Sequence, residues 1–290
     1  MTLPARRTSG EMLNAITVDV EDYFQVQAFA NHIPRSSWDG IPRRVEANVD
    51  TVLALFDRSR SSGTFFALGW IAERHPQMIR RIVAAGHELA SHGYDHKRAD
   101  CLDLAAFRED VHRSKLVLED IAGTEIRGYR APTFSIGRTN LWAYDVLEDE
   151  GYMYSSSIYP IRHDLYGDAA ASRVPFRPGS GQLWEIPLTT RRLFGQNLPS
   201  AGGGYLRLLP YWLWRRNLLY VNRKGNLNSV FYFHPWELDA AQPRIPGINL
   251  RTSVRHYLNL SAMQKRLEAL LTDFRWARLD YVFADLLTPN

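Results

Sequence analysis

Cysteine is almost absent from this sequence of 290 residues. The chain has one cysteine, Cys101, so it cannot form an intrachain disulfide. A single thiol also excludes a metal site built from several thiolates. Any transition metal in this protein would therefore be held by nitrogen and oxygen atoms.

Long hydrophobic runs are also missing from the N-terminal region. Residues 1–11 contain two arginines but no apolar run behind them, and the apolar stretch 12–20 is interrupted by Asn14 and Asp19. A signal peptide or a membrane span needs a longer uninterrupted apolar segment. We expect neither, and we expect a cytoplasmic protein that could still work at the inner face of the membrane.

Strong charge of either sign is lacking as well. Lys and Arg number 35 against 31 Asp and Glu, a formal net charge of +4, and no basic low-complexity tail is present. We therefore expect no nucleic-acid partner. The hydrophobic share of 45% is that of a globular protein, and the length suffices for one large α/β domain.

Strand and helix patterns alternate along the chain. Short apolar runs predict buried strands at 13–20, 64–67, 88–91, 126–129 and 230–233. Helical spacing of apolar residues predicts helices over about 45–56, 71–85, 107–121, 141–150, 206–221 and from about 261 onward. Such alternation is typical of an α/β fold with a parallel sheet or barrel, and no linker divides the chain.

Two histidines, His92 and His96, follow the predicted strand 88–91. If the chain turns once between them, both imidazoles can hold one metal ion, and a carboxylate and water complete the coordination. Histidine pairs are also common on surfaces, so this spacing alone does not identify a metal site.

Three acidic residues end the first predicted strand: Asp19, Glu21 and Asp22. Strand alternation places Asp19 and Glu21 on one face, and Asp22 joins them if the strand breaks there. Carboxylates are rarely placed against a core without partners. Two interpretations of these three acids stay open: a functional acidic group, or an acidic loop in solvent.

Two more strand ends carry residues that could take part in catalysis. Arg130 follows the strand 126–129 and could hold a neighbouring carboxylate in its ionised form, unless it is an ordinary surface arginine. His234 ends an aromatic strand and is either a buried core histidine or a general acid that works near neutral pH. All four segments follow strands, and sites in parallel α/β barrels are built at that edge.

The acidic cluster, the histidine pair, Arg130-Ala131-Pro132 and the strand before His234, in this order, resemble the polysaccharide deacetylases of carbohydrate esterase family four, also called the NodB homology family. The resemblance runs from about residue 13 to about residue 237. It implies a distorted (β/α) barrel with seven strands.

The same resemblance implies a division of the chain. Residues 12–242 would form the deacetylase barrel, and residues 243–290 would be a C-terminal extension packed on the same domain.

The resemblance also assigns a role to the matching residue of each motif: a catalytic base (Asp19), two metal ligands (His92 and His96), an arginine that fixes the base (Arg130), an oxyanion-binding backbone N–H (Thr133) and a general acid (His234). The implied cofactor is a divalent metal, Zn²⁺ being the expected ion.

The sequence departs from the family pattern at two motifs. The commonest first motif has two adjacent aspartates, whereas Asp19 is followed by Val-Glu-Asp, as in a branch with allantoinase-like and some peptidoglycan-deacetylase-like members. That branch nominates Glu21 as the metal carboxylate, with Asp22 as the alternative. The fourth motif has only serines at 155–157, so the acidic partner of Arg130 stays open.

Three stretches, 19–24, 155–164 and 202–210, resemble a narrower bacterial group that accompanies exosortase-linked exopolysaccharide gene clusters. This resemblance implies a metal-dependent N-deacetylase that acts on N-acetylated sugars of a polysaccharide or its lipid-linked precursor in exopolysaccharide biosynthesis. The alternatives are an allantoinase-like amidohydrolase for a small ureide or amide, and a non-catalytic glycan-binding module.

We expect four residues to contact the substrate: Thr133, Phe134, Tyr23 and Trp184. An open aromatic groove would suit a sugar chain, and a closed pocket would suit a small amide. The predicted helix that includes residues 211–224 places aromatic residues beside basic ones, so it could lie on an anionic membrane surface or simply pack on the barrel. The oligomeric state stays open.

Overall fold

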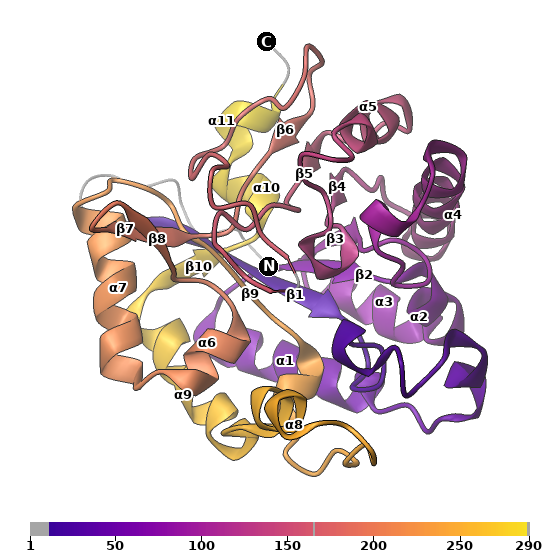
Figure 1. The fold of residues 1–290 in the computed structure, drawn as a ribbon, viewed down its shortest axis with the longest axis horizontal. Coiled ribbons are helices and arrows are strands. Elements are labelled where there is room, and N and C mark those ends of the chain that lie inside the picture. The colour runs from indigo at the N-terminus through magenta and orange to yellow at the C-terminus, as the bar shows by residue number, and fades with distance from the viewer. Residues whose placement is uncertain (1–11, 165, 289–290) are drawn as a thin grey trace.

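Parallel strands form the centre of the molecule, a computed structural model that describes residues 12–164 and 166–288 (Figure 1). The strands are β1 (Leu13–Val20), β2 (Thr64–Ala67), β3 (Glu88–Ser91), β4 (Gly128–Tyr129), β5 (Tyr154–Ser155), β6 (Trp184–Glu185), β7 (Thr190–Leu193), β8 (Gln196–Pro199), β9 (Val230–Phe233) and β10 (Arg275–Ala277).

Seven of these strands pair in parallel, in the order β9-β1-β2-β3-β4-β5-β6, and curl into a half-barrel. β10 adds a parallel pairing to the first residues of β1, and β7 and β8 form a separate antiparallel hairpin. The predicted seven-stranded, distorted (β/α) barrel is therefore confirmed.

Strand β1 joins distant parts of the chain. Thr17 pairs with Thr64 of β2 on one side and with Tyr232 of β9 on the other, and Leu13 pairs with Arg275 of β10. The beginning, the middle and the end of the described chain thus meet on this one strand.

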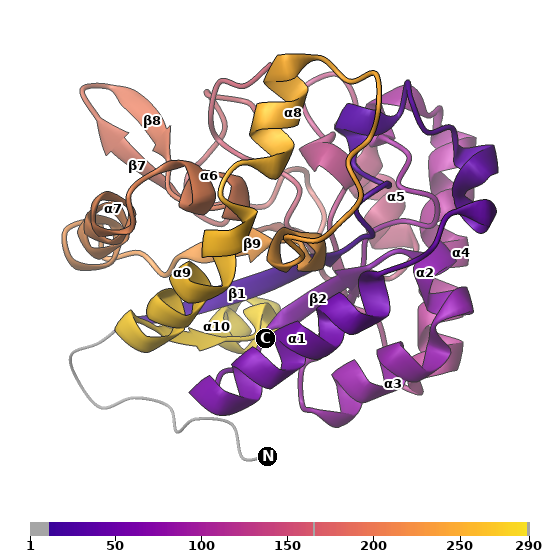
Figure 2. The ribbon, with the colours of Figure 1, turned by 90° about the horizontal axis from the view of Figure 1, so that it is seen from below.

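Helices surround the sheet. They are α1 (Val45–Ser59), α2 (Gly69–Arg74), α3 (Pro76–Ala84), α4 (Leu104–Ala122), α5 (Trp142–Asp149), α6 (Gly203–Leu208), α7 (Tyr211–Arg223), α8 (Leu250–Tyr257), α9 (Leu260–Asp273), α10 (Leu279–Val282) and α11 (Ala284–Leu287). Helices α9, α1, α3, α4 and α5 pack each against the next along the outside of the half-barrel (Figure 2). This order follows the strands, as expected of βα units.

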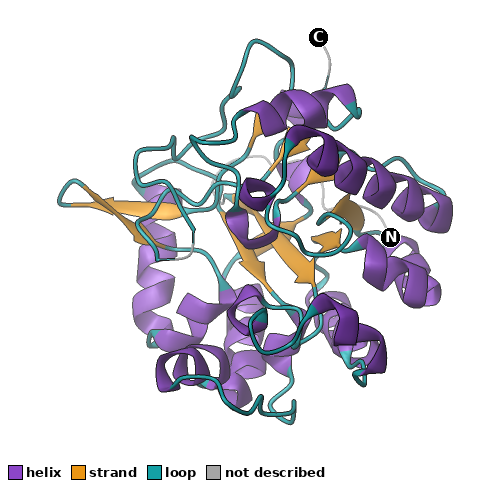
Figure 3. Ribbon diagram, turned by 45° about the vertical axis from the view of Figure 1, so that its right-hand side comes forward, coloured by secondary structure: helices purple, strands orange, loops and turns teal. Residues whose placement is uncertain are grey.

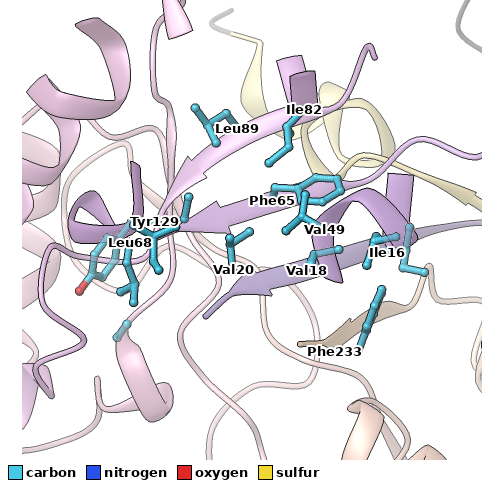
Figure 4. Packing of buried hydrophobic residues seen from close by; sticks show 14 of the residues in the cluster. Ile16, Val18, Val20, Val49, Phe65, Leu68, Ile82, Leu89, Tyr129 and Phe233 are labelled. Carbon is cyan, nitrogen blue, oxygen red and sulfur yellow. The ribbon is translucent and has the colours of Figure 1, made fainter. Parts of the chain in front are cut away.

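The main core lies between these helices and the sheet. Ile16 and Val18 of β1, Phe65 of β2 and Phe233 of β9 share one fully buried cluster with Val49 of α1 (Figure 4). Alternate residues of a strand point to opposite sides, so the residues between these apolar positions point into the half-barrel.

Prolines divide two of the predicted helices. The single helix predicted over 71–85 is two helices, because Pro76 has no N–H to continue α2 and instead starts α3. The helix predicted over 206–221 breaks in the same way before Pro210, where Leu209 has an extended backbone. Both predictions were wrong in this respect.

A buried acid ties the C-terminal region to the amino ends of the strands. Glu88 accepts hydrogen bonds from the hydroxyl groups of Thr64 (2.5 Å) and Tyr154 (2.8 Å) and from the backbone N–H of Asp280 (3.2 Å). Burial, together with the negative charge of Asp280, raises the pKa of Glu88 to about 8. The first residues of β2, β3 and β5 are thus held to α10.

Among the described residues, no helix is both long and apolar enough to cross a membrane. The expectation for residues 1–11 concerns residues outside the described part of the chain.

Candidate active site

Glu21, His92 and His96 form a buried group at the carboxyl ends of β1 and β3. The Oε1 atom of Glu21 lies 3.1 Å from Nε2 of His92 and 2.9 Å from Nε2 of His96. All three residues are buried, at most 8% exposed, and their ligand atoms lie within 4.8 Å of one another. Two of the predicted metal ligands and the favoured carboxylate are thus brought together.

A tight turn after β3 positions the two imidazoles. Gly93 has a φ of +75°, and an added Cβ would lie 2.7 Å from the carboxylate of Asp110, so a side chain would be strained there. Asp110 also accepts the backbone N–H of Tyr94. His96 itself has a φ of 56°, which turns its ring back toward His92.

Hydrogen bonding leaves His92 ready to act as a metal ligand. Its Nδ1 lies 2.8 Å from the carbonyl oxygen of Arg130, and this acceptor requires Nδ1 to carry the proton. The Nε2 atom faces Glu21 at 3.1 Å and is therefore the atom of His92 that would bind a metal ion. A metal ligand held by a backbone carbonyl at its other nitrogen is the usual arrangement around protein-bound zinc. The donor set of two imidazoles and a carboxylate fits a divalent metal.

Glu21 is ionised in this environment. Burial by itself raises the pKa of the carboxyl group, but His96 and His234, and hydrogen bonds from His92 and His96, outweigh it. The pKa of Glu21 is therefore held well below its usual value. An anionic carboxylate between imidazoles is the form that binds a cation.

Asp22 lies elsewhere, although it is adjacent to Glu21. Its carboxylate accepts a hydrogen bond from the backbone N–H of the next residue, Tyr23 (2.9 Å). It also accepts from the backbone N–H groups of Arg44 (2.6 Å) and Val45 (3.0 Å) at the amino end of α1. The structure does not bring Asp22 to the histidine pair, because these N–H groups occupy its oxygens. Glu21 alone of the two candidates lies in the group.

Asp19 is paired with Arg130 inside the half-barrel. Nη1 of Arg130 lies 2.6 Å from Oδ1 of Asp19, and these residues are 0% and 2% exposed. The same nitrogen donates to the hydroxyl of Thr17 (2.7 Å). A buried charge pair is stable only when its remaining donors are satisfied, and Ser156 satisfies them by accepting from Nε and Nη2. The serine run that lacks the family's acid thus supplies neutral acceptors to Arg130.

His234 lies on the other side of Glu21. Its Nε2 is 3.8 Å from Oε1 of Glu21, and its Nδ1 is 3.1 Å from Oε1 of Glu237. Burial lowers the pKa of His234, but the negative charges of Glu21 and Glu237 outweigh burial and raise the pKa to about 9. His234 is therefore protonated at neutral pH and able to donate from Nε2.

Arg207 of α6 stabilises the pair formed by His234 and Glu237. Its Nε lies 2.7 Å from Oε2 of Glu237, and its Nη1 donates to the carbonyl oxygens of His256 (2.9 Å) and Leu258 (2.7 Å). Burial raises the pKa of Glu237, but Arg207 and His234 lower it to about 2. The region between α8 and α9 therefore holds His234 through two buried charged residues.

Aromatic rings add a second connection to this region. Trp236 stacks between His234 and His256, with ring centroids 5.1 Å and 4.2 Å away. Because His256 belongs to α8, the last third of the chain forms one wall of the site.

A cavity of about 180 Å³ opens over these groups. Asp19, Glu21, both metal-binding histidine candidates and His234 line it, together with Thr133 and Phe134. Consecutive positive φ values, 57° at Thr133 and 49° at Phe134, turn the backbone after Arg130 along the cavity wall. Such conformations cost energy in non-glycine residues and are found most often at functional sites.

Two of the expected substrate contacts lie outside this cavity. Tyr23 is 3% exposed and packs edge-on against Phe24 in the core. Trp184 lines a different cavity with Glu148 and Arg177. Strand β6, which carries Trp184, is at the far end of the half-barrel from β9, which explains this separation.

Sequence reasoning left several site residues without a role. Glu237 follows His234 by three residues, and this spacing in a single helical turn could have suggested the contact. Arg207, Tyr166 and His256 had no such local signal, because they reach the cavity only through the packing of distant segments.

The half-barrel and its buried carboxylate–imidazole group define a class of α/β proteins whose site lies at the carboxyl ends of the strands. Residues 36–154 match the family model for polysaccharide deacetylases, so this segment of the chain is similar to that family. Residues 156–284 match a domain of unknown function (DUF3473).

Two relatives that are named as deacetylases match part of the chain. The chain is 27% identical over 114 residues to a peptidoglycan deacetylase of Helicobacter pylori, which covers 39% of this chain and 38% of that protein. It is 36% identical over 102 residues to a chitooligosaccharide deacetylase of Sinorhizobium fredii, which covers 33% of this chain and 42% of that protein. The matching segment thus spans about two fifths of the length of these relatives.

Solved structures share the fold over nearly the whole chain. A Mycobacterium smegmatis protein assigned to the polysaccharide deacetylases superposes with a TM-score of 0.62 at 23% identity, covering 100% of this chain and 96% of that one. The Bc1960 peptidoglycan N-acetylglucosamine deacetylase gives a TM-score of 0.51 at 16% identity, covering 94% and 89%. At these identities the likeness is one of fold.

The contribution of the Arg207–Glu237 pair beside His234 can be tested by measuring the stability of the protein. Arg207→Met removes one of the two cationic partners of the buried Glu237, so we expect the free energy of unfolding to fall by about 3–5 kcal/mol. Adding Glu237→Gln removes the buried negative charge, and the double variant should regain part of this loss. Urea denaturation of both variants measures the difference. A double variant no more stable than Arg207→Met would show that lost packing, and not the buried negative charge, causes the effect.

Proposed function

We propose that this chain is a metal-dependent N-deacetylase that hydrolyses the acetamide groups of N-acetylated sugars in a polysaccharide or in its lipid-linked precursor. It would be a hydrolase of linear amide C–N bonds, with acetate and a free amino sugar as products. The observation that carries this proposal is the buried Glu21–His92–His96 group, which is flanked by an Asp19–Arg130 pair and by His234.

Glu21, His92 and His96 would hold the metal, for which Zn²⁺ is our choice because it accepts this mixture of nitrogen and oxygen ligands. When bound, such an ion polarises the acetamide carbonyl and makes water more acidic.

Asp19 would act as the base that takes a proton from the attacking water. Arg130, at 2.6 Å, pairs with the carboxylate and directs one of its oxygens, while the other oxygen is available to the water. The backbone N–H of Thr133, at the cavity wall, is suited to stabilise negative charge on the substrate oxygen.

His234 would act as the acid that protonates the departing nitrogen. An amide nitrogen is a poor leaving group unless it gains a proton, and His234 carries one at neutral pH. Glu237 fixes the ring through Nδ1, so that Nε2 faces the cavity.

The shape around the site favours an extended substrate. A second cavity of about 470 Å³ shares Val26, Gln27 and His96 with the first one, so the two form adjoining spaces on either side of His96. A glycan chain can occupy both, whereas a small ureide needs only one. We propose that this reaction belongs to exopolysaccharide biosynthesis, at the inner face of the membrane if the sugar is lipid-linked; the resemblance of three sequence stretches to the exosortase-linked group supports this role.

We also propose that residues 243–290 are an extension of the barrel domain and not a separate unit. In support, β10 pairs with β1, α9 packs on α1, and the α8–α9 junction holds Arg207. The residues of this range beyond 288 are outside the described structure.

Neighbouring carboxylates provide a matched test of the metal site. Glu21→Gln removes a ligand, and we expect zinc affinity to fall by about 100-fold or more. Asp22→Asn changes the adjacent carboxylate at the amino end of α1 and should retain bound zinc. Elemental analysis after dialysis against zinc measures both. Equal zinc content in Glu21→Gln and the wild type would refute the assignment.

The catalytic roles predict large losses of rate. Asp19→Asn and His234→Ala should each lower kcat for acetate release from an N-acetylglucosamine oligomer by about 10²- to 10⁴-fold. Asp120→Asn is the control, because it makes the same chemical change on the exposed surface of α4. We expect it to leave kcat at the wild-type value. Wild-type rates in either site variant would exclude this mechanism.

The pH profile should report the contact between Glu237 and His234. Glu237 raises the pKa of His234, so Glu237→Gln should lower that pKa, and the proton needed by the leaving group is lost at lower pH. We expect the alkaline limb of kcat against pH to move toward lower pH. An alkaline limb at the wild-type position would mean that His234 does not supply this proton.

A further inference from the structure

An exposed phenylalanine stands at the tip of the β7–β8 hairpin, which projects from the body of the protein (Figure 3). Phe194 is 96% exposed and has a φ of 48°, followed by Gly195 with a φ of 77°. A two-residue turn with both φ values positive favours Asn-Gly, and a bulky residue is strained at its first position. Because the side chain of Phe194 is exposed, no burial within the protein offsets this strain.

Helix α7 presents a similar combination beside the hairpin. Trp212 is 65% exposed and Tyr220 is 43% exposed, and Arg216 lies between them at helical spacing on the same side. Arg223 and Lys224 follow at the exposed end of the helix.

The hairpin and α7 form one continuous surface. The guanidinium of Arg191 lies over the ring of Tyr220, 4.4 Å from its centroid, and also donates to Asn217 at 2.6 Å. Figure 1 and Figure 2 both show the hairpin and α7 on the same side of the molecule, away from α3 and α4. We call this surface the hairpin–α7 face; its members are Phe194, Trp212 and Tyr220, and Arg216, Arg223 and Lys224.

Acidic residues are missing from this entire part of the sequence. No Asp or Glu occurs from Ile186 to Trp236, although the chain contains 31 of them. Seven cations lie in the same stretch: Arg191, Arg192, Arg207, Arg215, Arg216, Arg223 and Lys224.

Most of these cations have no carboxylate to neutralise them. Arg207 pairs with Glu237, and Arg215 pairs with Asp273 from α9. Within residues 12–164 and 166–288, the three cations of the hairpin–α7 face form no salt bridge. Their charge is therefore available to an external partner.

We propose that the hairpin–α7 face docks on an anionic phospholipid membrane. Exposed aromatic side chains enter the boundary between headgroups and acyl chains, and unpaired arginine and lysine side chains bind anionic headgroups. Phe194, held at the tip of a two-stranded hairpin, is placed to insert first. A second copy of this chain is a poor occupant, because a symmetric interface would set the same unpaired cations against one another.

Docking in this way does not depend on the deacetylase activity. If the proposed function is correct, the membrane would bring the enzyme to lipid-linked sugars. Binding to vesicles and hydrolysis of a soluble oligosaccharide can be measured separately, so the failure of one proposal is distinguishable from the failure of the other.

Sedimentation of the full chain with vesicles tests the docking. We expect binding to phosphatidylcholine vesicles that contain phosphatidylglycerol, weak binding to phosphatidylcholine alone, and loss of binding as salt is raised. Phe194→Asn should lower the partition coefficient by about tenfold. Because Asn-Gly suits this turn, the variant should be at least as stable as the wild type in thermal denaturation. Arg216→Glu should lower the partition coefficient by at least about fivefold.

Two matched controls lie on the other side of the molecule. Leu116→Asn removes an exposed apolar side chain from α4, and Arg80→Glu reverses a charge on α3. Both should bind vesicles as the wild type does.

Three results would overturn the proposal. The first is no binding to phosphatidylglycerol vesicles at low salt. The second is equal loss of binding in the test and control variants. The third is a dimer in analytical ultracentrifugation that Phe194→Asn dissociates, which would assign the face to self-association.

Discussion

Three carboxylates within four residues have to be buried at the end of β1, and each is stabilised by a different kind of partner. Asp19 pairs with a guanidinium, Glu21 with two imidazoles, and Asp22 with backbone N–H groups of α1. A buried carboxylate without such partners costs several kcal/mol. The positions of β3, β4 and α1 around β1 are therefore tied to the charges at its end, and the cavity forms where those charges meet.

The two family segments of the chain share one site. The polysaccharide deacetylase segment contains the histidine pair and Arg130, whereas the segment of unknown function contains His234, Glu237 and Arg207. Hydrogen bonds and stacked rings connect the latter to α8 and α9. The segment of unknown function is thus part of the wall and of the charge network of the cavity, in addition to carrying the hairpin and α7.

Local patterns in the sequence predicted five of the strands, β1 to β4 and β9, because alternation and spacing act within one element. The family resemblance joined Glu21 to His92 and His96, and Asp19 to Arg130. Both kinds of prediction failed where the result depends on packing between distant segments. Asp22 turned to α1, Tyr23 entered the core, and Trp184 lies on a strand at the far edge of the half-barrel. The proline breaks at 76 and 210 were local signals that helical periodicity concealed.

The pairing of β1 has a consequence for the order in which the protein folds during synthesis. This strand leaves the ribosome well before its partners on β9 and β10, which are made only when the chain reaches residues 230 and 275. Contacts so distant in sequence form slowly, and an apolar strand with a free edge is prone to aggregate. One edge of β1 therefore stays unpaired until residues 230–233 have been made, and the site is incomplete until His234 follows them.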